Sequence, residues 1–226
     1  MAPADCTSGD PPQVAFRQAR LAMVADQVAA RGVMDPRVLD AMRAVPRHEF
    51  VPLTLRDDAY VDSPLPIGHG QTISQPYIVA LMTELARPSP ADRVLEVGTG
   101  SGYQAAVISR LVSRVFTVEL VDPLAQSASA VLRRLGYANV TVRSGDGYLG
   151  WPEEAPFDII LVTAAPEEVP AALVAQLKPG GRLIVPVGRV WDVQDLQLIE
   201  KDAGGKVKAR SVIPVRFVPM VKKRDG

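Results

Sequence analysis

Short apolar segments alternate with helical segments along the second half of the chain. The apolar segments occur at 94–97, 115–119, 140–142, 158–162 and 183–187. Their length is typical of strands buried on both faces of a parallel sheet. Helical spacing of apolar residues falls between them, at about 101–112, 123–135 and 167–177. This alternation predicts a doubly wound α/β sheet with right-handed crossovers.

The pattern changes after Gly188. Residues 193–200 alternate apolar and polar side chains, 202–205 (DAGG) favour a turn, and 206–217 are extended again. This order predicts an antiparallel β-hairpin at the end of the sheet. Within 201–226, eight basic residues face two acidic ones. We interpret them as a solvated face of the hairpin, with a weak attraction for acidic polypeptides as the alternative.

Helical patterns also precede the sheet. The first runs from Val14 to a stop at Gly32, and its apolar stripe is Leu21, Val24, Ala25 and Val28. A second helix starts at Asp35-Pro36, with Asp as the cap, and ends at Pro46; its stripe is Val38, Leu39 and Met42. A third begins at Pro76 and buries Ile78, Leu81, Met82 and Leu85.

The segment between the second and third helices is rich in proline and glycine. Residues 46–75 read mainly as loop, and a loop of this length in a compact domain is often functional. Residues 1–12 read as a disordered leader and 13–226 as one domain. Its three parts are the N-terminal helices and substrate loop at 13–91, an α/β core at 92–188 and the hairpin at 189–226.

Composition narrows the classes of protein. The formal net charge is zero, which argues against a dedicated nucleic-acid binder. We expect no membrane association, because no signal peptide or 18-residue apolar run is present, and a cytoplasmic location follows. Cys6 is the only cysteine, which leaves no disulfide framework or zinc cluster. His48 and His69 lack metal-ligand spacing, so we expect no metal site.

A glycine loop is the strongest local signal. Glu96 ends the first predicted strand, and Gly98, Thr99, Gly100, Ser101 and Gly102 follow it at the start of a helix. Such glycines let the backbone approach a ligand, and the helix N-terminus offers free N–H groups. The spacing differs from the dinucleotide fingerprint. The acid Glu96 suits a ligand with an ammonium or sulfonium group; the alternative is a turn that uses glycine only for its geometry.

Two further acids follow the next strands. Glu119 ends the second strand, where a carboxylate can accept two hydrogen bonds from a ribose diol. Asp146-Gly147 follows the third strand, and its carboxylate could bind an adenine amino group unless the pair is only a turn. Because ligands of open α/β sheets bind at the carboxyl ends of the strands, these groups point to one crevice.

The combination resembles the S-adenosylmethionine-dependent methyltransferases, and within them the protein-L-isoaspartate O-methyltransferase family. The matching segments are VPRHEFVP (45–52), LPIGHGQTISQP (65–76), VLEVGTGSGYQAA (94–106), SGDGYLGW (144–151), FDIILVTAAP (157–166), LKPGGRLIVPVG (177–188) and RFVPMV (216–221). The resemblance spans about residues 14–221, and TISQP is its specific part. It implies a Rossmann-like methyltransferase sheet, mostly parallel, that follows N-terminal helices and ends with an inserted antiparallel strand in a C-terminal hairpin.

The resemblance also implies the reaction and the roles of residues. The methyl acceptor would be the free α-carboxylate of an isoaspartyl residue in a damaged protein, and its ester would allow repair through a succinimide. Ser74 holds the family's catalytic position. The residues expected to contact S-adenosylmethionine are Thr72, Ile73, Glu96, Gly98, Thr99, Gly100, Ser101, Gly102, Glu119, Leu120, Asp146 and Gly147. We expect a monomer whose partners are isoaspartyl proteins and peptides.

This chemistry needs few residues. A carboxylate has a pKa of about 4 and is already ionised at neutral pH, so no general base is required. A hydroxyl such as that of Ser74 could orient the acceptor; the alternative is that it only caps the helix at Pro76. Trp151 and Tyr103 could flank the site or belong to the core.

Three other functions remain open at this stage. A methyltransferase for a small molecule or specialised peptide is disfavoured by TISQP, and an NAD-dependent oxidoreductase by the glycine spacing. A binding module without activity is disfavoured by the presence of Ser74, Glu119 and Asp146. Amine methyltransferases of nucleic acids usually carry Asn or Asp, two prolines and an aromatic residue after the fourth strand. Here Thr163 starts a TAAP segment.

Overall fold

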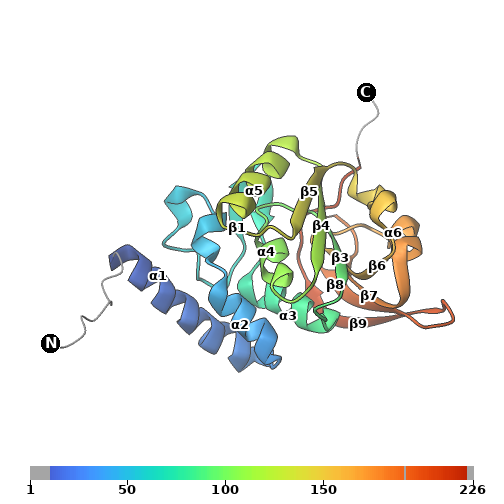
Figure 1. Ribbon diagram of the computed structural model, residues 1–226, viewed down its shortest axis with the longest axis horizontal. Coiled ribbons are helices and arrows are strands. Elements are labelled where there is room, and N and C mark those ends of the chain that lie inside the picture. Colours follow the sequence, from blue (N-terminus) through green and yellow to red (C-terminus); the bar gives the residue numbers. More distant parts are fainter. Residues whose placement is uncertain (1–10, 191, 223–226) are drawn as a thin grey trace.

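The apolar segments of the second half form neighbouring strands of one sheet. The computed structural model describes residues 11–190 and 192–222. Its seven-stranded sheet has the order β5–β4–β3–β6–β7–β8–β9 (Figure 1). The strands are β3 (Arg93–Val97), β4 (Arg114–Glu119), β5 (Val140–Ser144), β6 (Phe157–Val162), β7 (Leu177–Val187), β8 (Gln194–Lys201) and β9 (Val207–Val215).

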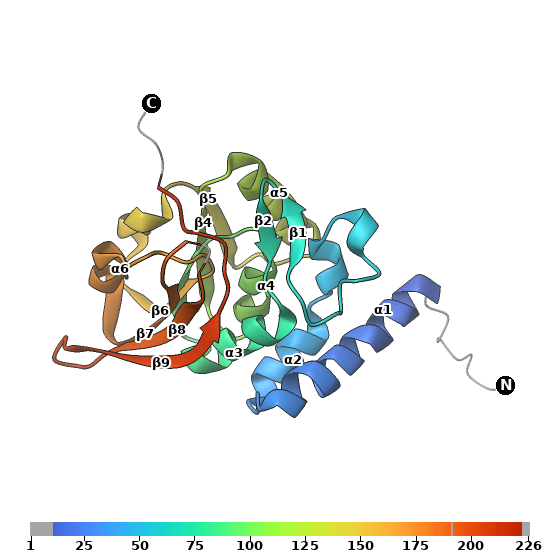
Figure 2. The same cartoon turned by 180° about the vertical axis from the view of Figure 1, so that it is seen from behind.

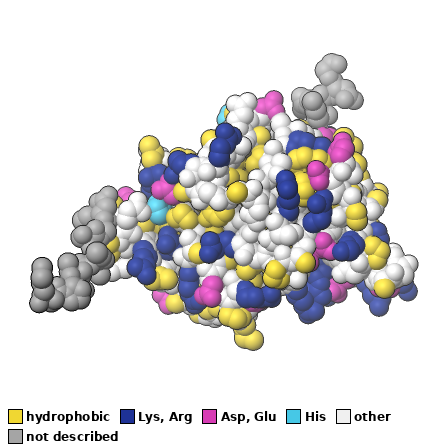
Figure 3. Space-filling view, in the orientation of Figure 1, with side chains coloured by type: hydrophobic (Ala, Val, Ile, Leu, Met, Phe, Trp, Pro, Cys, Tyr) yellow, Lys and Arg dark blue, Asp and Glu magenta, His cyan; other side chains and the backbone are white. Residues whose placement is uncertain are grey.

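The sheet is parallel from β5 to β7 and antiparallel from β7 to β9. This arrangement confirms the predicted doubly wound sheet and its C-terminal hairpin. One detail differs: β7, β8 and β9 lie in chain order, so the last strand adds at the edge and none is inserted. Figure 3 shows basic side chains gathered at its lower right, where Figure 1 draws the hairpin of β8 and β9. The exposed basic residues near the turn of this hairpin include Lys206, Lys208 and Arg210.

Helices cover both faces of the sheet (Figures 1 and 2). One face carries α3 (Pro76–Ala86), α4 (Tyr103–Ser109) and α5 (Asp122–Arg134), and the opposite face carries α6 (Ala171–Gln176). Two boundaries differ most from the prediction. Helix α6 begins only after Pro170, and β7 begins at Leu177, before an irregular stretch around Pro179 and the glycines that follow it.

The first helical segment has nearly the predicted extent, and Val24 and Val28 of its predicted stripe are buried, but the other two positions are not. Helix α1 (Pro11–Ala22) leads into the π-helical turn η1 (Met23–Val28) and the 3₁₀ turn η2 (Ala29–Arg31). Leu21 and Ala25 are exposed, and Phe16, Arg20 and Met23 face inward instead. A pattern of apolar residues cannot predict that Arg20 faces inward. Its guanidinium can do so because it donates hydrogen bonds to Arg43 O (2.6 Å) and Tyr60 Oη (3.2 Å). The helix also takes up the last two residues of the expected leader; residues 1–10 with Cys6 lie outside the described residues.

The next two helices start where the sequence predicts. Asp35 caps α2 (Pro36–Ala44) by accepting a hydrogen bond from Arg37 N (2.9 Å). On α3, Met82 is fully buried, but the other predicted positions are only half-buried. The most buried positions also include Val79, Ala80, Thr83 and Ala86. The burial is broader than one stripe because α3 lies between the sheet and the N-terminal helices.

The predicted loop at 46–75 contains short elements. They are the 3₁₀ turns η3 (Arg47–Phe50) and η4 (Leu53–Leu55) and a hairpin of β1 (Leu65–Gly68) and β2 (Gln71–Ile73), seen in Figure 2. The strands are too short for a pattern of period two to identify them. Proline and glycine within them also resemble loop composition. The hairpin places Ile67 against the glycine loop, near Gly100.

Candidate active site

A cleft of about 780 Å³ opens at the carboxyl ends of β3, β4 and β6. Strand β3 pairs with β4 on one side and with β6 on the other, so the loops that follow them diverge at this point. The hairpin strand β2 and the start of α3 form a further wall. Residues 218–221, which follow β9, return across the same edge through the contacts of Ala165 N with Val218 O and Met220 N with Ala165 O (both 2.8 Å).

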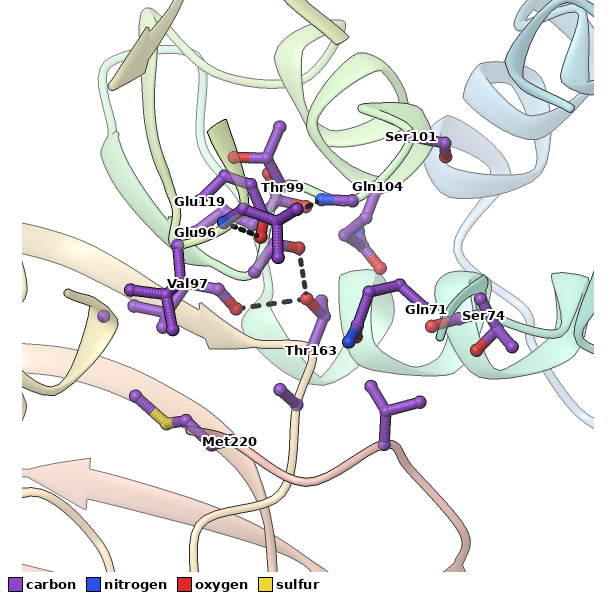
Figure 4. A pocket seen from close by; sticks show the side chains of 18 of the residues that line it. Gln71, Ser74, Glu96, Val97, Thr99, Ser101, Gln104, Glu119, Thr163 and Met220 are labelled. Atoms are coloured by element: carbon purple, nitrogen blue, oxygen red, sulfur yellow. Dashed lines mark hydrogen bonds between the residues drawn. The ribbon is translucent and has the colours of Figure 1, made fainter. Parts of the chain in front are cut away.

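Most residues predicted from the sequence line this cleft (Figure 4). They are Thr72, Ile73, Ser74, Glu96, Gly98, Thr99, Gly100, Ser101, Glu119, Leu120 and Gly147. Gly102 and Asp146 do not line it. Gly102 is the N-cap of α4, with a φ of +86°, and a Cβ there would lie 3.1 Å from Leu132 Cδ1. Its requirement for glycine therefore comes from the turn and from packing against α5.

Asp146 lies at the rim. Its Oδ1 accepts a hydrogen bond from Tyr148 N (2.8 Å) and caps the short turn η5 (Gly147–Leu149). The residue borders a neighbouring pocket with Tyr148 and Met220, and Met220 also lines the main cleft. Gly147 lies closer to the main cleft, where a Cβ would be 2.4 Å from Val97 Cγ1. The Asp-Gly turn of the sequence is therefore real, and its glycine is needed for close packing.

The glycine loop approaches the next strand end so closely that side chains are excluded. Gly98 has a φ of +96°, and a Cβ on it would lie 2.6 Å from Thr163 Oγ1. The Thr163 hydroxyl is 2.6 Å from Gly98 O and 3.1 Å from Val97 O (Figure 4). Sequence reasoning missed Thr163, although its place directly after a parallel strand marks it as a residue of the crevice.

Glu119 joins the second strand end to the glycine loop. The side chain is 6% exposed, and its Oε2 accepts from Gly100 N (2.8 Å) and its Oε1 from Val121 N (3.0 Å). A carboxylate oxygen has more than one acceptor site, so both oxygens can still receive a hydroxyl donor from the cleft. The carboxylate is thus fixed in place and suited to a vicinal diol.

Glu96 lies beneath the loop and is fully buried. The Thr117 hydroxyl donates to its Oε2 (2.5 Å), and Thr99 Oγ1 lies 2.7 Å from Thr117 Oγ1. Burial raises the pKa of Glu96 to about 8, although the hydrogen bond from Thr117 acts in the opposite direction. Among the described residues its Oε1 has no hydrogen-bond partner, and Glu96 is one of the residues that border the cleft. An orphaned acidic oxygen of this kind suits a cationic group, as the sequence predicts for an ammonium or sulfonium ligand.

Ser74 does not cap the helix that follows it. The N-cap of α3 is Gln75, which makes no side-chain cap hydrogen bond, and Tyr77 N donates instead to Asp62 Oδ1 (3.1 Å). In the described part of the chain no group hydrogen-bonds to the Ser74 hydroxyl. Ser74 is half-buried and lines the cleft, so this hydroxyl is available to a ligand.

A second groove of about 980 Å³ adjoins the first, and Thr72, Ser74 and Thr163 border both. Its other walls come from the N-terminal turns, the start of α3 and the chain around β9. They include Arg31, Gln75, Tyr77, Ile78, Ile213, Val215, Arg216 and Phe217. The lining is mixed apolar and polar, and the described residues contribute two arginines and no carboxylate to it, which suits a peptide that carries a free carboxylate.

Some residues in the cleft were not predicted. Gln71 and Gln104 line it, and so do the returning residues 218–221. Gln104 Nε2 donates to Thr83 Oγ1 (2.9 Å), while its Oε1 is buried without a partner. No local signal marks Gln104, because it belongs to a helix whose residues are all buried. The RFVPMV segment was recognised only through the family resemblance, and nothing in its composition places it beside β6.

Several residues considered from the sequence lie elsewhere. Tyr103 is 1% exposed and packs in the core, and Trp151 stands edge-on to Phe116. The ring of His48 is buried, with Nδ1 2.6 Å from Tyr60 Oη, and burial lowers its pKa. Among residues 11–190 and 192–222, no three His, Cys, Asp or Glu side chains are grouped so as to hold a metal ion. None of the helices described has the length and apolar character to cross a membrane.

Known proteins are similar to this chain over most of its length. A family model described as Protein-L-isoaspartate(D-aspartate) O-methyltransferase (PCMT) matches residues 19–225. A Protein-L-isoaspartate O-methyltransferase 1 of Cupriavidus necator is 54% identical over 215 residues, which cover 94% of this chain and 83% of that protein.

The chain belongs to this family. A Protein-L-isoaspartate O-methyltransferase of a Synechococcus species is 57% identical over 212 residues, 91% of this chain and 86% of its own. The activity is that of a protein-L-isoaspartate O-methyltransferase, and the reaction depends on S-adenosylmethionine. The family and activity that the TISQP and glycine-loop segments predict are thereby confirmed.

Two solved structures have the same fold as this chain. One described as a protein-L-isoaspartate O-methyltransferase has a TM-score of 0.78 and 34% identity, over 90% of this chain and 65% of its own. A beta-aspartate methyltransferase (PCMT) from Plasmodium falciparum, in complex with S-adenosyl-L-homocysteine, has a TM-score of 0.77 and 26% identity. That alignment covers 90% of this chain and 99% of the other. The fold around the cleft is therefore the fold of the family.

Proposed function

We propose that the main cleft binds S-adenosylmethionine and that Ser74 orients the acceptor α-carboxylate at the junction with the second groove. The observation that carries this proposal is the unpartnered Ser74 hydroxyl, on the border shared by the two clefts. A hydroxyl that serves no structural bond is free to donate to a carboxylate oxygen. The glycine loop, Glu119 and Glu96 supply the opposite side of the cleft.

We assign the cofactor contacts by chemistry. The close backbone approach of the loop Gly98, Thr99, Gly100 and Ser101 suits the methionine end, and the orphaned Oε1 of Glu96 suits its cationic part. Glu119, with Leu120 beside it, suits the ribose diol. Gly147 borders the adenine end, with Asp146 at the rim, and Thr72 and Ile73 cover the ligand from β2. Gly102 acts through the turn that aims the helix.

The residues of the chain have little chemistry to perform. When bound, S-adenosylmethionine supplies an electrophilic methyl group on a positively charged sulfur. An oxygen of the ionised acceptor carboxylate would form the new bond to that methyl carbon as the bond to sulfur breaks. The positive charge on sulfur and the negative charge of the carboxylate are both lost, and no proton is transferred. The protein therefore contributes alignment and exclusion of water, for which Ser74, Gln71 and residues 218–221 surround the junction.

The second groove is the proposed site of the damaged peptide. Apolar side chains such as Ile213 and Phe217 can cover the backbone of an extended peptide, and Arg216 has no ion-pair partner among the residues described. The product ester has a better leaving group than the carboxylate it replaces. The main chain can then close to a succinimide outside the enzyme and reopen partly as normal aspartate.

A set of four synthetic peptides tests this proposal. They share one sequence and carry an isoaspartyl residue, its α-carboxamide, a normal aspartyl residue, or an isoaspartyl residue with methylated flanking amides. We expect methyl transfer to the isoaspartyl peptide and none to the α-carboxamide or the normal aspartyl peptide. Transfer to the peptide with methylated flanking amides should continue if side chains of the groove provide most of the binding. Transfer to the α-carboxamide peptide would contradict the proposed acceptor.

We propose further that the protein works as a monomer in the cytoplasm. The large apolar side chains that are exposed, such as Met34, Leu53 and Leu149, come from segments that are distant in the sequence. The single cysteine suits a reducing compartment. Sedimentation at micromolar concentration and cell fractionation test the two statements. A stable dimer, or recovery with membranes, would contradict them.

A further inference from the structure

Asp62 connects three segments beside the acceptor groove. Its Oδ2 accepts hydrogen bonds from Arg31 Nη1 (2.5 Å) and Gln75 Nε2 (2.6 Å), and its Oδ1 accepts from Tyr77 N (3.1 Å). The side chain is only 18% exposed. Arg31 ends the N-terminal helical turns, whereas Gln75 and Tyr77 start α3, so a single carboxylate holds segments that are distant in the sequence.

Three of the groups it holds form a wall of the groove. Arg31, Gln75 and Tyr77 all line the second groove, together with Ser74. The Arg31 guanidinium also lies over the Tyr77 ring, 3.6 Å from its centroid. The contacts of Asp62 therefore determine the shape of the surface that meets the acceptor.

The backbone of Ser74 is fixed on both sides. On the N-terminal side, Ile73 pairs with Leu65 in the β1–β2 hairpin and is buried. On the C-terminal side, the carbonyl of Gln75 accepts a hydrogen bond from Val79 N (3.1 Å) in α3, and the side-chain amide of Gln75 is held by Asp62. Removing the contact between Asp62 and Gln75 would leave the Gln75 side chain unheld and the position after Ser74 fixed only by the first backbone bond of α3.

Charge explains why Asp62 is paired with Arg31. An uncompensated carboxylate at the wall would repel the acceptor carboxylate. The Arg31 guanidinium neutralises it and is held in the groove wall by both Asp62 and the Tyr77 ring. The pair thus provides a rigid wall without presenting negative charge to the substrate.

We propose that Asp62 is the positioning residue for Ser74 and for the Arg31 side of the acceptor groove. This inference rests on the proposed role of Ser74. It assigns to Asp62 an effect on turnover that passes through Gln75 and Arg31, in addition to the capping of α3 through Tyr77.

Asp62→Asn separates the two effects. The Asn Oδ1 can still accept from Tyr77 N and keep the cap, but its amide NH₂ would face the donors of Arg31 and Gln75. We expect kcat on an isoaspartyl peptide to fall by about ten-fold or more. The affinity for S-adenosylmethionine, measured by calorimetry, should change by less than about two-fold, because Asp62 does not line the main cleft. The matched control is Asp35→Asn, which makes the same change at the cap of α2, where Asp35 also pairs with an arginine.

A swap of the hydrogen-bonding groups tests the mechanism directly. In Asp62→Asn with Gln75→Glu, the Asn amide donates to the new carboxylate, and the charge beside Arg31 is restored. This double variant should recover kcat to within about three-fold of the parent protein. A variant that merely repairs stability would not restore kcat selectively. Gln75→Leu, which keeps Asp62 and the cap, provides the test of lowered kcat if Asp62→Asn does not fold.

Two outcomes would overturn the inference: unchanged kcat in Asp62→Asn, or a double variant that remains as slow as the single one. Ser74→Ala is measured in the same series. If Ser74→Ala is slow and Asp62→Asn is not, only the positioning role fails. If Ser74→Ala turns over normally, the proposed function of Ser74 fails first.

Discussion

Ser74 is the residue on which acceptor binding depends in the proposed mechanism. Ser74→Ala should lower kcat on an isoaspartyl peptide by about ten- to a hundred-fold, the effect of losing one hydrogen bond to a charged group in the transition state. The melting temperature should stay unchanged, because Ser74 provides no helix cap. Steady-state kinetics and thermal melts on the same preparation measure both quantities.

Ser63→Ala is the matched control for this variant. Its hydroxyl lies in the same segment, donates only to Pro64 O (3.3 Å), and lines neither cleft. It should leave kcat unchanged. A slow Ser63→Ala enzyme would indicate a general effect on the loop, and a normal Ser74→Ala enzyme would remove Ser74 from the mechanism.

Both carboxylate oxygens of Glu119 accept hydrogen bonds from backbone N–H groups of the protein itself. In Glu119→Gln one oxygen becomes an NH₂ group, which cannot accept from Gly100 N or Val121 N. We expect the affinity for S-adenosylmethionine to fall by about ten-fold or more, with a small loss of stability. Calorimetry measures the affinity. The exposed pair at Glu153 offers the control Glu153→Gln, and equal affinities in the two variants would contradict the ribose assignment.

Glu96 makes cofactor binding depend on pH. Its pKa of about 8 in the free protein means that it is mostly protonated at pH 7. A cationic ligand favours the ionised form, so binding at pH 7 should release a proton, and affinity should rise from pH 6 to pH 9. Calorimetry in buffers of different ionisation enthalpy detects the proton. Glu96→Gln should abolish the release; if the parent protein releases none, the ligand does not meet this carboxylate.

The same shift has a consequence for the stability of the free protein. The folded pKa of Glu96 lies above its ordinary value of 4.5, so the folded state binds the proton more tightly than the unfolded state. Its contribution to the free energy of unfolding is therefore full below about pH 4.5 and declines as the pH rises toward 8. Glu96→Gln should flatten this part of the stability curve.

In the glycine loop, the effect of close approach to a neighbouring side chain can be separated from the effect of backbone strain. Gly98→Ala combines a positive φ with a contact of 2.6 Å to Thr163 Oγ1. It should displace the loop and weaken cofactor binding by more than about ten-fold. Gly32→Ala has nearly the same φ, +97° against +96°, and nothing lies within 4 Å of its added carbon. It should lose stability but retain cofactor affinity. Equal affinities for S-adenosylmethionine in the two variants would mean that Gly98 is required only for its positive φ and not for the close contact with Thr163.

The β1–β2 hairpin and α3 act together as a second element. The hairpin places Ile67 near Gly100 and Ile73 in the core, and the N-cap of α3, Gln75, follows Ser74 directly. Ser74 thus lies between two short elements, each of which is held by contacts with the rest of the protein. This arrangement explains how a segment with the composition of a loop can hold a side chain in a fixed position.

At the scale of the whole molecule, the cofactor should stabilise the fold. A ligand at a hundred times its Kd that binds only the folded state contributes about 2.7 kcal/mol. For a domain of this size that corresponds to a rise in Tm of roughly 5–10 °C. Ser74→Ala should show the same rise, and Glu119→Gln a smaller one at equal cofactor concentration. A rise of the same size with NAD would contradict the cofactor assignment.

Much of this architecture follows from the sequence. Strands buried on both faces leave continuous apolar segments, and helices that begin at Asp-Pro or Pro leave local signals, so the order of elements was predictable. The strand-end rule then brings Glu96, Gly98 and Glu119 to one crevice, where the structure places them. Both steps need only information within a few neighbouring residues.

The tertiary structure decided what depends on distant partners. Arg20 lies on a buried face because Arg43 O and Tyr60 accept its hydrogen bonds, so Leu21 is exposed against the apolar pattern. Residues 218–221 reach the cleft only through their pairing with Ala165. Ser74 is released from capping because Asp62 supplies the cap from another segment. The sequence by itself determined the elements and the chemical groups at their ends; long-range hydrogen bonds decided which of those groups remain free to bind.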